Sequence, residues 1–142
     1  MSKNELKIEH MSVGDLPQVI ALENQIFSNP KPARVFEHDM NIYYAAKFGE
    51  KVVGYIGVEH ILDEAHIINI AVHPDFRRQG IASALVKNIL GSAKSFFLEV
   101  RKSNIPAQKM YEKHGFHVID ERKKYYVDNE EDALVMLLVS TK

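Results

Sequence analysis

The stretch between residues 66 and 100 does most to constrain the fold of this chain. It begins with a run rich in β-branched residues, His66–Val72, which stops at His73-Pro74. Apolar residues then recur at helical spacing through Gly80–Leu90, and a nearly continuous apolar run follows at Ser95–Val100. Consecutive strands joined by a helix pair in parallel through a crossover connection. The chain is therefore expected to contain one parallel strand pair with a crossover helix.

Hairpins and further helices are predicted on both sides of this unit. Ahead of it, the residue patterns indicate a strand, two helices and a hairpin that turns at Gly49-Glu50. Behind it, they indicate a helix that ends at Gly115 and two more strands. The elements expected outside the central unit are Glu5–His10, 15–27, Arg34–Met40, Ile42–Phe48, Lys51–His60, Asn104–His114, Phe116–Tyr126 and Ala133–Val139.

This order predicts an α/β fold of the α+β mixed-sheet kind, with helices on the faces of the sheet. About seven mostly antiparallel strands, a central parallel pair and about four helices are expected. A single domain over residues 1–142 is expected as well, because domains most often hold about 100–150 residues.

Composition excludes several classes of protein. The chain has a formal net charge of −1 and no Cys, so disulfides, thiolate zinc sites and Cys nucleophiles are ruled out. The seven His show no metal-ligand spacing, and no metal is predicted. The balanced charge argues against a nucleic-acid partner.

The longest apolar run, Ala133–Val139, is far short of the roughly 20 residues that span a bilayer. Without a signal-peptide pattern at the N-terminus, a cytoplasmic protein with no membrane partner is expected.

The first chemical signal is the segment Arg77-Arg78-Gln79-Gly80-Ile81-Ala82, where a strand gives way to a helix. The first N–H groups of a helix lack internal partners and carry the positive end of its dipole, which suits a phosphate. Gly80 lets an oxygen approach the backbone, and the two arginines add bidentate donors. A Walker A loop and a dinucleotide fingerprint are both excluded by the spacing. From the glycine and arginines alone, an ordinary exposed turn is favoured.

Two further residues could carry acid–base chemistry. Glu99 shares a strand face with Phe97, and burial in so apolar a strand is expected to raise the pKa of its carboxyl, as suits a general base. The alternative is a strand-end glutamate paired with Arg101 or a nearby Lys. Tyr111, on the following helix, can donate a proton from its hydroxyl. Its alternative is a core aromatic with an exposed hydroxyl, the more common case for a lone Tyr.

Taken in this order, the three signals resemble the GCN5-related N-acetyltransferase superfamily. Its acetyl-CoA motif, Gln/Arg-x-x-Gly-x-Gly/Ala, is matched by residues 77–82, and the order of elements agrees over the whole chain. The chain is still more similar to the bacterial ribosomal-protein-alanine N-acetyltransferases. The residues that carry this closer resemblance are Leu62-Asp63-Glu64-Ala65, Asn69-Ile70-Ala71-Val72, Leu98-Glu99-Val100-Arg101, Ser103-Asn104, Tyr111-Glu112, Gly115-Phe116, Arg122, Tyr125-Tyr126 and Glu131-Asp132-Ala133.

The resemblance implies an acetyltransferase fold and direct transfer of an acetyl group from acetyl-CoA to an amine. It implies that Glu99 is the base, directly or through water, and that Tyr111 protonates the departing thiolate. It implies that the Val72 N–H faces the thioester oxygen and that residues 78–83 bind the pyrophosphate. The full set of implied coenzyme contacts is Ile70, Ala71, Val72, Arg77, Arg78, Gln79, Gly80, Ile81, Ala82, Ser83 and Asn104.

The resemblance also implies an acceptor, the N-terminal alanine of a small-subunit ribosomal protein. An α-amino group, with a pKa of about 7.7–8.0, is easier to deprotonate than Lys at about 10.4. One departure concerns the loop after the first helix, where the subfamily usually carries an aromatic, often a Pro-Trp pair. Here residues 27–32 read Phe-Ser-Asn-Pro-Lys-Pro, and the chain has no Trp. The acceptor is therefore less constrained than the donor.

Other acceptors stay open: a protein Lys, a polyamine or a small-molecule amine. An acyl-CoA-binding sensor domain that kept the pyrophosphate loop is the non-enzyme alternative, and a monomer or weak dimer is expected. An acidic segment beside Tyr125-Tyr126 is expected to attract a basic peptide by salt-sensitive steering. Its alternative is a solvated hairpin turn. The acidic residues of that segment are Asp128, Glu130, Glu131 and Asp132.

Overall fold

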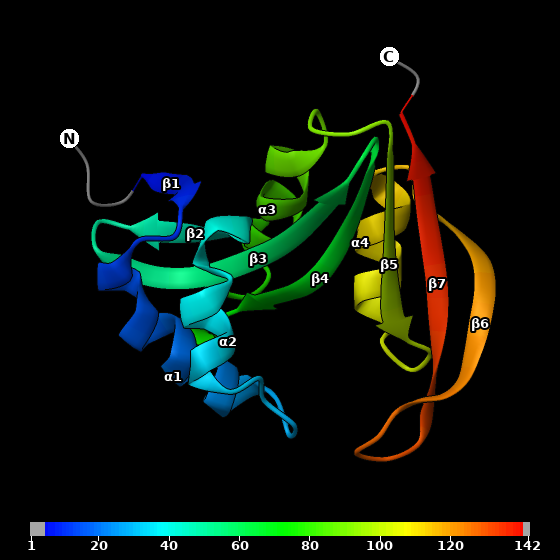
Figure 1. Ribbon diagram of the computed structural model, residues 1–142, viewed down its shortest axis with the longest axis horizontal. Helices are drawn as coiled ribbons and strands as arrows, with labels where there is room; N and C mark the ends of the chain where they lie inside the picture. The colour runs from blue at the N-terminus through cyan, green and yellow to red at the C-terminus, as the bar shows by residue number, and fades with distance from the viewer. Residues whose placement is uncertain (1–4, 141–142) are drawn as a thin grey trace. The chain divides into compact units, whose positions relative to one another are not determined.

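The computed structural model describes residues 5–140, in which seven strands form a mixed sheet in the order β1-β2-β3-β4-β5-β7-β6 (Figure 1). The strands are β1 (Leu6–His10), β2 (Tyr43–Phe48), β3 (Lys51–Ile61), β4 (Glu64–Val72), β5 (Ser95–Arg101), β6 (His117–Tyr126) and β7 (Glu131–Val139). The helices are α1 (Leu16–Ile26), α2 (Ala33–His38), α3 (Ile81–Ile89) and α4 (Ile105–Lys113). The predicted fold class and element order are confirmed.

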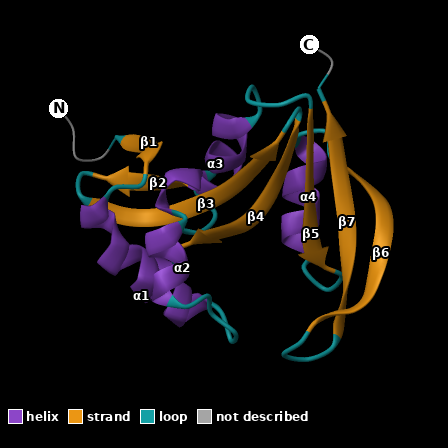
Figure 2. Cartoon of the chain, viewed as in Figure 1, coloured by secondary structure: helices purple, strands orange, loops and turns teal. Residues whose placement is uncertain are grey.

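The parallel pair is β4 with β5, and α3 forms the crossover between them (Figure 2). The register runs from Glu64 opposite Ser95 to Ile67 opposite Leu98. The pairs β1–β2, β2–β3, β5–β7 and β6–β7 are antiparallel. Because β7 pairs with both β5 and β6, the helix α4 connects two strands that are not neighbours.

The described residues divide into two compact units, one of residues 5–58 and 69–88 and the other of residues 59–68 and 89–140. In the first unit, β3 is buried along most of its length. Glycine is required at position 54 because atoms of β4 and α3 come close to its backbone. A Cβ there would lie 2.9 Å from the carbonyl oxygen of Ala71 and 3.3 Å from Ile81 Cγ2. The absence of a side chain at Gly54 therefore lets β4 and the start of α3 pack directly on β3.

The core of the second unit follows the alternation of β5. Phe96, Leu98 and Val100 are buried, while the residues between them are half-buried. Helix α4 follows β5 in the chain, and it ends as predicted at Gly115, whose φ is +102°. A Cβ on that glycine would lie 3.0 Å from Leu138 Cδ1, so both the backbone angle and the space favour glycine.

The element ends differ from the predictions by a few residues. Differences of two residues occur at the end of α2, which is His38 rather than Met40, at the start of β4, which is Glu64 rather than His66, and at the start of β7, which is Glu131 rather than Ala133. The difference at β7 has a visible cause. The first two residues of the strand are acidic, and their carboxylates accept hydrogen bonds from the backbone N–H groups of Ser103 and Lys124. These tertiary contacts accompany a strand start two residues earlier than the apolar pattern predicts. Within residues 5–140, no helix combines the length and the apolar character needed to cross a bilayer.

Candidate active site

The loop between β4 and α3 belongs to the first unit and contains two departures from ordinary backbone angles, separated by one residue. Arg78 has a φ of +65° and Gly80 a φ of +79°. A Cβ on Gly80 would meet nothing within 4 Å, so this glycine is required by its backbone angle and not by a lack of space. Helix α3 begins at the next residue, and the Gly80 carbonyl accepts the N–H of Ala84 at 3.0 Å. The predicted junction of a basic turn with a glycine-led helix is therefore present.

The two arginines of this loop differ in their contacts. The Nε atom of Arg77 donates a hydrogen bond of 3.1 Å to the carbonyl oxygen of Val72, which ties the loop to the end of β4. The next N–H, that of His73, donates to the Val53 carbonyl at 2.8 Å. Arg78 is exposed. The end of β4 is thus held by two independent hydrogen bonds. Arg77 makes one of them, so it has a structural role in addition to the coenzyme contact that is predicted for it.

In the second unit, Glu99 lies on β5 with about 10% of its side chain exposed. Its Oε1 atom is 2.7 Å from Nε2 of His66, on β4. The hydrogen bond from His66 holds the pKa of the Glu99 carboxyl below its usual value, and this outweighs the opposing effect of burial; the charges of His66 and Arg122 act in the same direction as the bond. The expectation that burial raises this pKa is wrong, because a partner meets the carboxylate.

The partner of Glu99 is a residue that the sequence analysis missed. His66 stands opposite Phe97 in the parallel register, and the two rings stack with centroids 4.4 Å apart at an angle of 8°. Glu99 is two residues beyond Phe97 and therefore on the same face of the sheet. The sequence does show a histidine in the strand that is predicted to pair with β5. Its contact with Glu99 could not be predicted from this, because the contact depends on the register between the two strands.

Tyr111 is 4% exposed on α4, and its ring packs edge-on against Phe116 with centroids 5.6 Å apart. Burial, followed by the charge of Tyr126, raises the pKa of the Tyr111 hydroxyl well above its usual value. The hydroxyl therefore stays protonated at neutral pH, as a proton donor must. The burial of the ring also agrees with the predicted alternative, a core aromatic with an exposed hydroxyl, so burial does not distinguish the two roles.

Asn104 is the N-terminal cap of α4. Its Oδ1 atom accepts the N–H of Ala107 at 3.2 Å. Near it, the Nε2 atom of Gln108 donates to the carbonyl oxygens of Arg101 and Lys102 at 3.1 and 3.0 Å. The turn between β5 and α4 is thus fixed by side chains from the helix. The predicted coenzyme contact of Asn104 stays a prediction beside this structural role.

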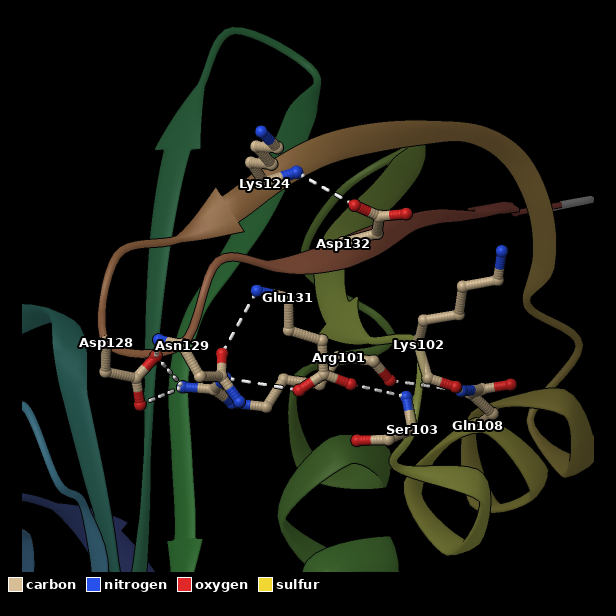
Figure 3. A network of polar contacts seen from close by, with 9 residues as sticks. All are labelled: Arg101, Lys102, Ser103, Gln108, Lys124, Asp128, Asn129, Glu131 and Asp132. Atoms are coloured by element: carbon tan, nitrogen blue, oxygen red, sulfur yellow. Dashed lines mark hydrogen bonds and ion pairs between the residues drawn. The ribbon is translucent and has the colours of Figure 1, made fainter.

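Arg101 organises the turn between β6 and β7 (Figure 3). Its guanidinium contacts both carboxylate oxygens of Asp128, at 2.9 and 3.0 Å, and one oxygen of Glu131 at 3.3 Å. It also lies 4.0 Å from the ring centre of Tyr126. Lys123 pairs with Asp132 at 3.3 Å. Three of the four acidic residues predicted to attract a basic peptide therefore have basic partners within the chain, which weakens the steering expected from them.

A second carboxylate, also missed by the sequence analysis, is buried in the first unit. Glu23 on α1 is 3% exposed. Its Oε1 atom accepts hydrogen bonds from the Tyr55 hydroxyl at 2.7 Å and from Asn69 Nδ2 at 3.0 Å. Its Oε2 atom accepts the backbone N–H of Lys31 at 2.9 Å, which ties down the loop of residues 27–32. The available signal was its position four residues after Val19, on the apolar face of the helix.

Comparison with known proteins identifies the family. The model of the Acetyltransferase (GNAT) family matches residues 15–116. The chain belongs to this family. A Bacillus subtilis (strain 168) protein provisionally named as a ribosomal protein bS18-alanine N-acetyltransferase is 35% identical over 144 residues, which cover 94% of this chain and 95% of the relative. The Escherichia coli (strain K12) ribosomal protein bS18-alanine N-acetyltransferase is 30% identical, covering 92% of this chain and 95% of the relative.

Solved structures agree with this assignment. The crystal structure of the ribosomal-protein-S18-alanine N-acetyltransferase from Escherichia coli has a TM-score of 0.88 and 30% identity, covering 97% of this chain and 96% of the other. Arabidopsis thaliana NAA60, solved in complex with acetyl-CoA, has a TM-score of 0.87 at 16% identity, covers 96% of this chain and 100% of the other, and shows the shared fold. The GNAT protein described here is an N-acetyltransferase.

Proposed function

We propose that this N-acetyltransferase moves the acetyl group of acetyl-CoA to the α-amino group at a protein N-terminus, and that its acceptor is the N-terminal alanine of a small-subunit ribosomal protein. One observation carries the chemistry. The second unit holds a carboxylate with about 10% of its side chain exposed, Glu99 on β5, and a buried phenol, Tyr111 on α4. An ionised carboxylate can accept a proton and a phenol hydroxyl can donate one, which are the two proton transfers that the reaction needs.

Except for Asn104, which belongs to the second unit, the proposed contacts to the donor come from the first unit. The main chain of residues 70–72 holds the thioester and the pantetheine arm, and residues 78–83 hold the pyrophosphate at the start of α3. The open space at Gly80 and the exposed Arg78 fit an anionic group at this loop. The Val72 N–H stabilises the negative charge that develops on the thioester oxygen. Asn104 adds a contact to the coenzyme.

The second unit supplies the proton transfers. The amine nitrogen attacks the thioester carbon, so that a C–N bond forms and the C–S bond breaks. Glu99 removes a proton from the attacking nitrogen, and Tyr111 gives a proton to the departing thiolate. A carboxylate with a lowered pKa suffices here, because an α-amino group is partly neutral near pH 7.5 and loses its next proton only as the C–N bond forms.

The choice of acceptor rests on the two relatives whose names specify alanine of ribosomal protein bS18. A ribosomal acceptor places the reaction in the cytoplasm. Because Arg101 and Lys123 offset about half of the negative charge of the four acidic residues in this turn, we expect recognition of the acceptor to depend mainly on short-range contacts. The dependence of kcat/KM on salt should then be weak, in contrast to the salt-sensitive steering that the sequence suggested.

The test compares three acceptors at equal concentration with acetyl-CoA as donor. The first is a basic peptide that begins with a free alanine, the second is the same peptide with a blocked N-terminus and an internal lysine, and the third is spermidine. We expect the α-amine of the first peptide to be acetylated at the highest kcat/KM, with the product located by mass spectrometry. Efficient acetylation of the blocked peptide or of spermidine, without reaction of the free alanine, would refute this acceptor.

A further inference from the structure

We propose that His66 is a positioning residue for Glu99, and that the two side chains act as one dyad in which the imidazole orients the carboxylate for proton transfer. The inference rests on the proposed function, because it takes Glu99 as the base. The observation behind it is the hydrogen bond of 2.7 Å between His66 Nε2 and Glu99 Oε1, which joins residues on two neighbouring strands.

The chemistry of the contact fixes the position of one imidazole proton. An ionised carboxylate can only accept hydrogen bonds, so Nε2 of His66 must carry the proton that it donates. The bond engages Oε1 of Glu99, and Oε2, which takes no part in it, is the oxygen assigned to the proton of the amine. One oxygen is therefore held while the other reacts.

Packing restrains the imidazole in turn. The ring of His66 lies flat on the ring of Phe97, with an angle of 8° between the two planes. The side chains of His66 and Glu99 are 27% and 10% exposed, so most of the surface of both is covered by protein. The stack sets the plane of the imidazole, and the imidazole sets the direction of the carboxylate. Such support of a reacting group by a second residue is a recurrent requirement of catalytic sites.

Other charged and titratable groups surround the carboxylate without replacing this contact. From β6, Arg122 acts on Glu99 through its charge, and the charge of Glu99 contributes to the raised pKa values of Tyr125 and Tyr126. On β7, the residue opposite Glu99 is the apolar Val135. The hydrogen bond from His66 is the largest cause of the lowered pKa of Glu99. Loss of this bond should therefore raise that pKa.

The experiment uses two substitutions that separate the hydrogen bond from the packing. His66→Phe keeps an aromatic ring against Phe97 and removes the donor, whereas His66→Gln keeps an N–H donor near the position of Nε2. His117→Gln, an exposed histidine on β6, is the matched control. The pKa of the Glu99 carboxyl is measured by ¹³C NMR titration in each protein. The values of kcat and of KM for acetyl-CoA are measured at pH 8, and thermal unfolding verifies the fold.

In His66→Phe we expect the pKa of Glu99 to rise and kcat to fall roughly 10-fold or more, with KM for acetyl-CoA nearly unchanged. In His66→Gln most of kcat should return, and His117→Gln should match the wild type. An unchanged Glu99 pKa in His66→Phe would overturn the dyad. A raised pKa with an unchanged kcat would overturn the positioning role and leave the acetyltransferase proposal standing. The proposed role of Glu99 itself fails if Glu99→Gln keeps the full wild-type rate.

Discussion

Each of the two units contains one glutamate in apolar surroundings, and the two glutamates are used in different ways. In the first unit, both carboxylate oxygens of Glu23 accept hydrogen bonds, three in all, from side chains and backbone. In the second unit, the hydrogen bond to Glu99 from another residue comes from His66 and reaches Oε1, and the backbone of Glu99 itself also interacts with the carboxylate. A carboxylate whose two oxygens are both bound by other residues is suited to hold a structure together, whereas one bound by another residue at one oxygen, here called half engaged, is better suited to accept a proton. The number of donors, more than burial, separates the two roles.

The largest expected effect concerns the half-engaged carboxylate. Glu99→Gln keeps the shape of the side chain and an oxygen that can still accept from His66, but it removes the base. We expect kcat to fall about 100-fold or more, with little change in the midpoint of thermal unfolding. Steady-state rates with acetyl-CoA and an alanine-terminated peptide measure this. Glu112→Gln, on the exposed side of α4, is the control and should retain the wild-type kcat.

The fully engaged carboxylate should show the opposite pattern. Glu23→Ala leaves the Tyr55 hydroxyl, Asn69 Nδ2 and the Lys31 N–H without their acceptor. We expect the free energy of unfolding to fall by roughly 3 kcal/mol, since each buried unpaired donor costs about 1–3 kcal/mol. Urea unfolding measures the loss, with the exposed Glu37→Ala on α2 as the control. A stable Glu23→Ala protein with a strongly reduced kcat would break the comparison, because it would give Glu23 a chemical role.

Removal of the proposed acid, Tyr111, should lower kcat as removal of the proposed base does, but by a smaller factor. Tyr111→Phe keeps the ring that packs on Phe116 and removes only the hydroxyl. We expect kcat to fall roughly 10-fold, which corresponds to about 1.4 kcal/mol in the barrier, while the affinity for acetyl-CoA stays near that of the wild type. Steady-state rates measure kcat, and calorimetric titration measures the affinity for acetyl-CoA. A loss of affinity without a change in kcat would assign the residue to packing.

The smallest effect is expected in the loop of the first unit. Gly80→Ala meets no steric obstacle, but it places a Cβ at a φ of +79°, which costs about 1–2 kcal/mol in folding. The matched control is Gly91→Ala, where a Cβ also meets nothing within 4 Å and the backbone angle is an ordinary one. The control should be neutral or slightly stabilising. Equal free energies of unfolding for the two variants would show that the loop relaxes, and that backbone angle is not what requires glycine there.

Much of the fold could be predicted because its signals are local. The alternation of β5, the glycine that ends α4 and the glycine before α3 are each readable from a few neighbouring residues. The resemblance of residues 77–82 to an acetyl-CoA motif, and the family that it indicates, agree with the match over residues 15–116. Where the predicted ends were displaced, as at β7, hydrogen bonds from distant residues extended the element.

The sequence by itself determined the class of fold, the family and the candidate base and acid, since periodicity and motif spacing are properties of short segments. Only the tertiary structure decided what those side chains meet. His66 and Glu99 are 33 residues apart in the chain, and Glu23 and Asn69 are 46 apart. Contacts of that range depend on strand register, in which a shift of one residue turns every side chain to the other face of the sheet. For this reason the direction of the Glu99 pKa followed from register, and the burial of Glu23 followed from the packing of α1 against Tyr55 and Asn69; neither could be read from composition or spacing.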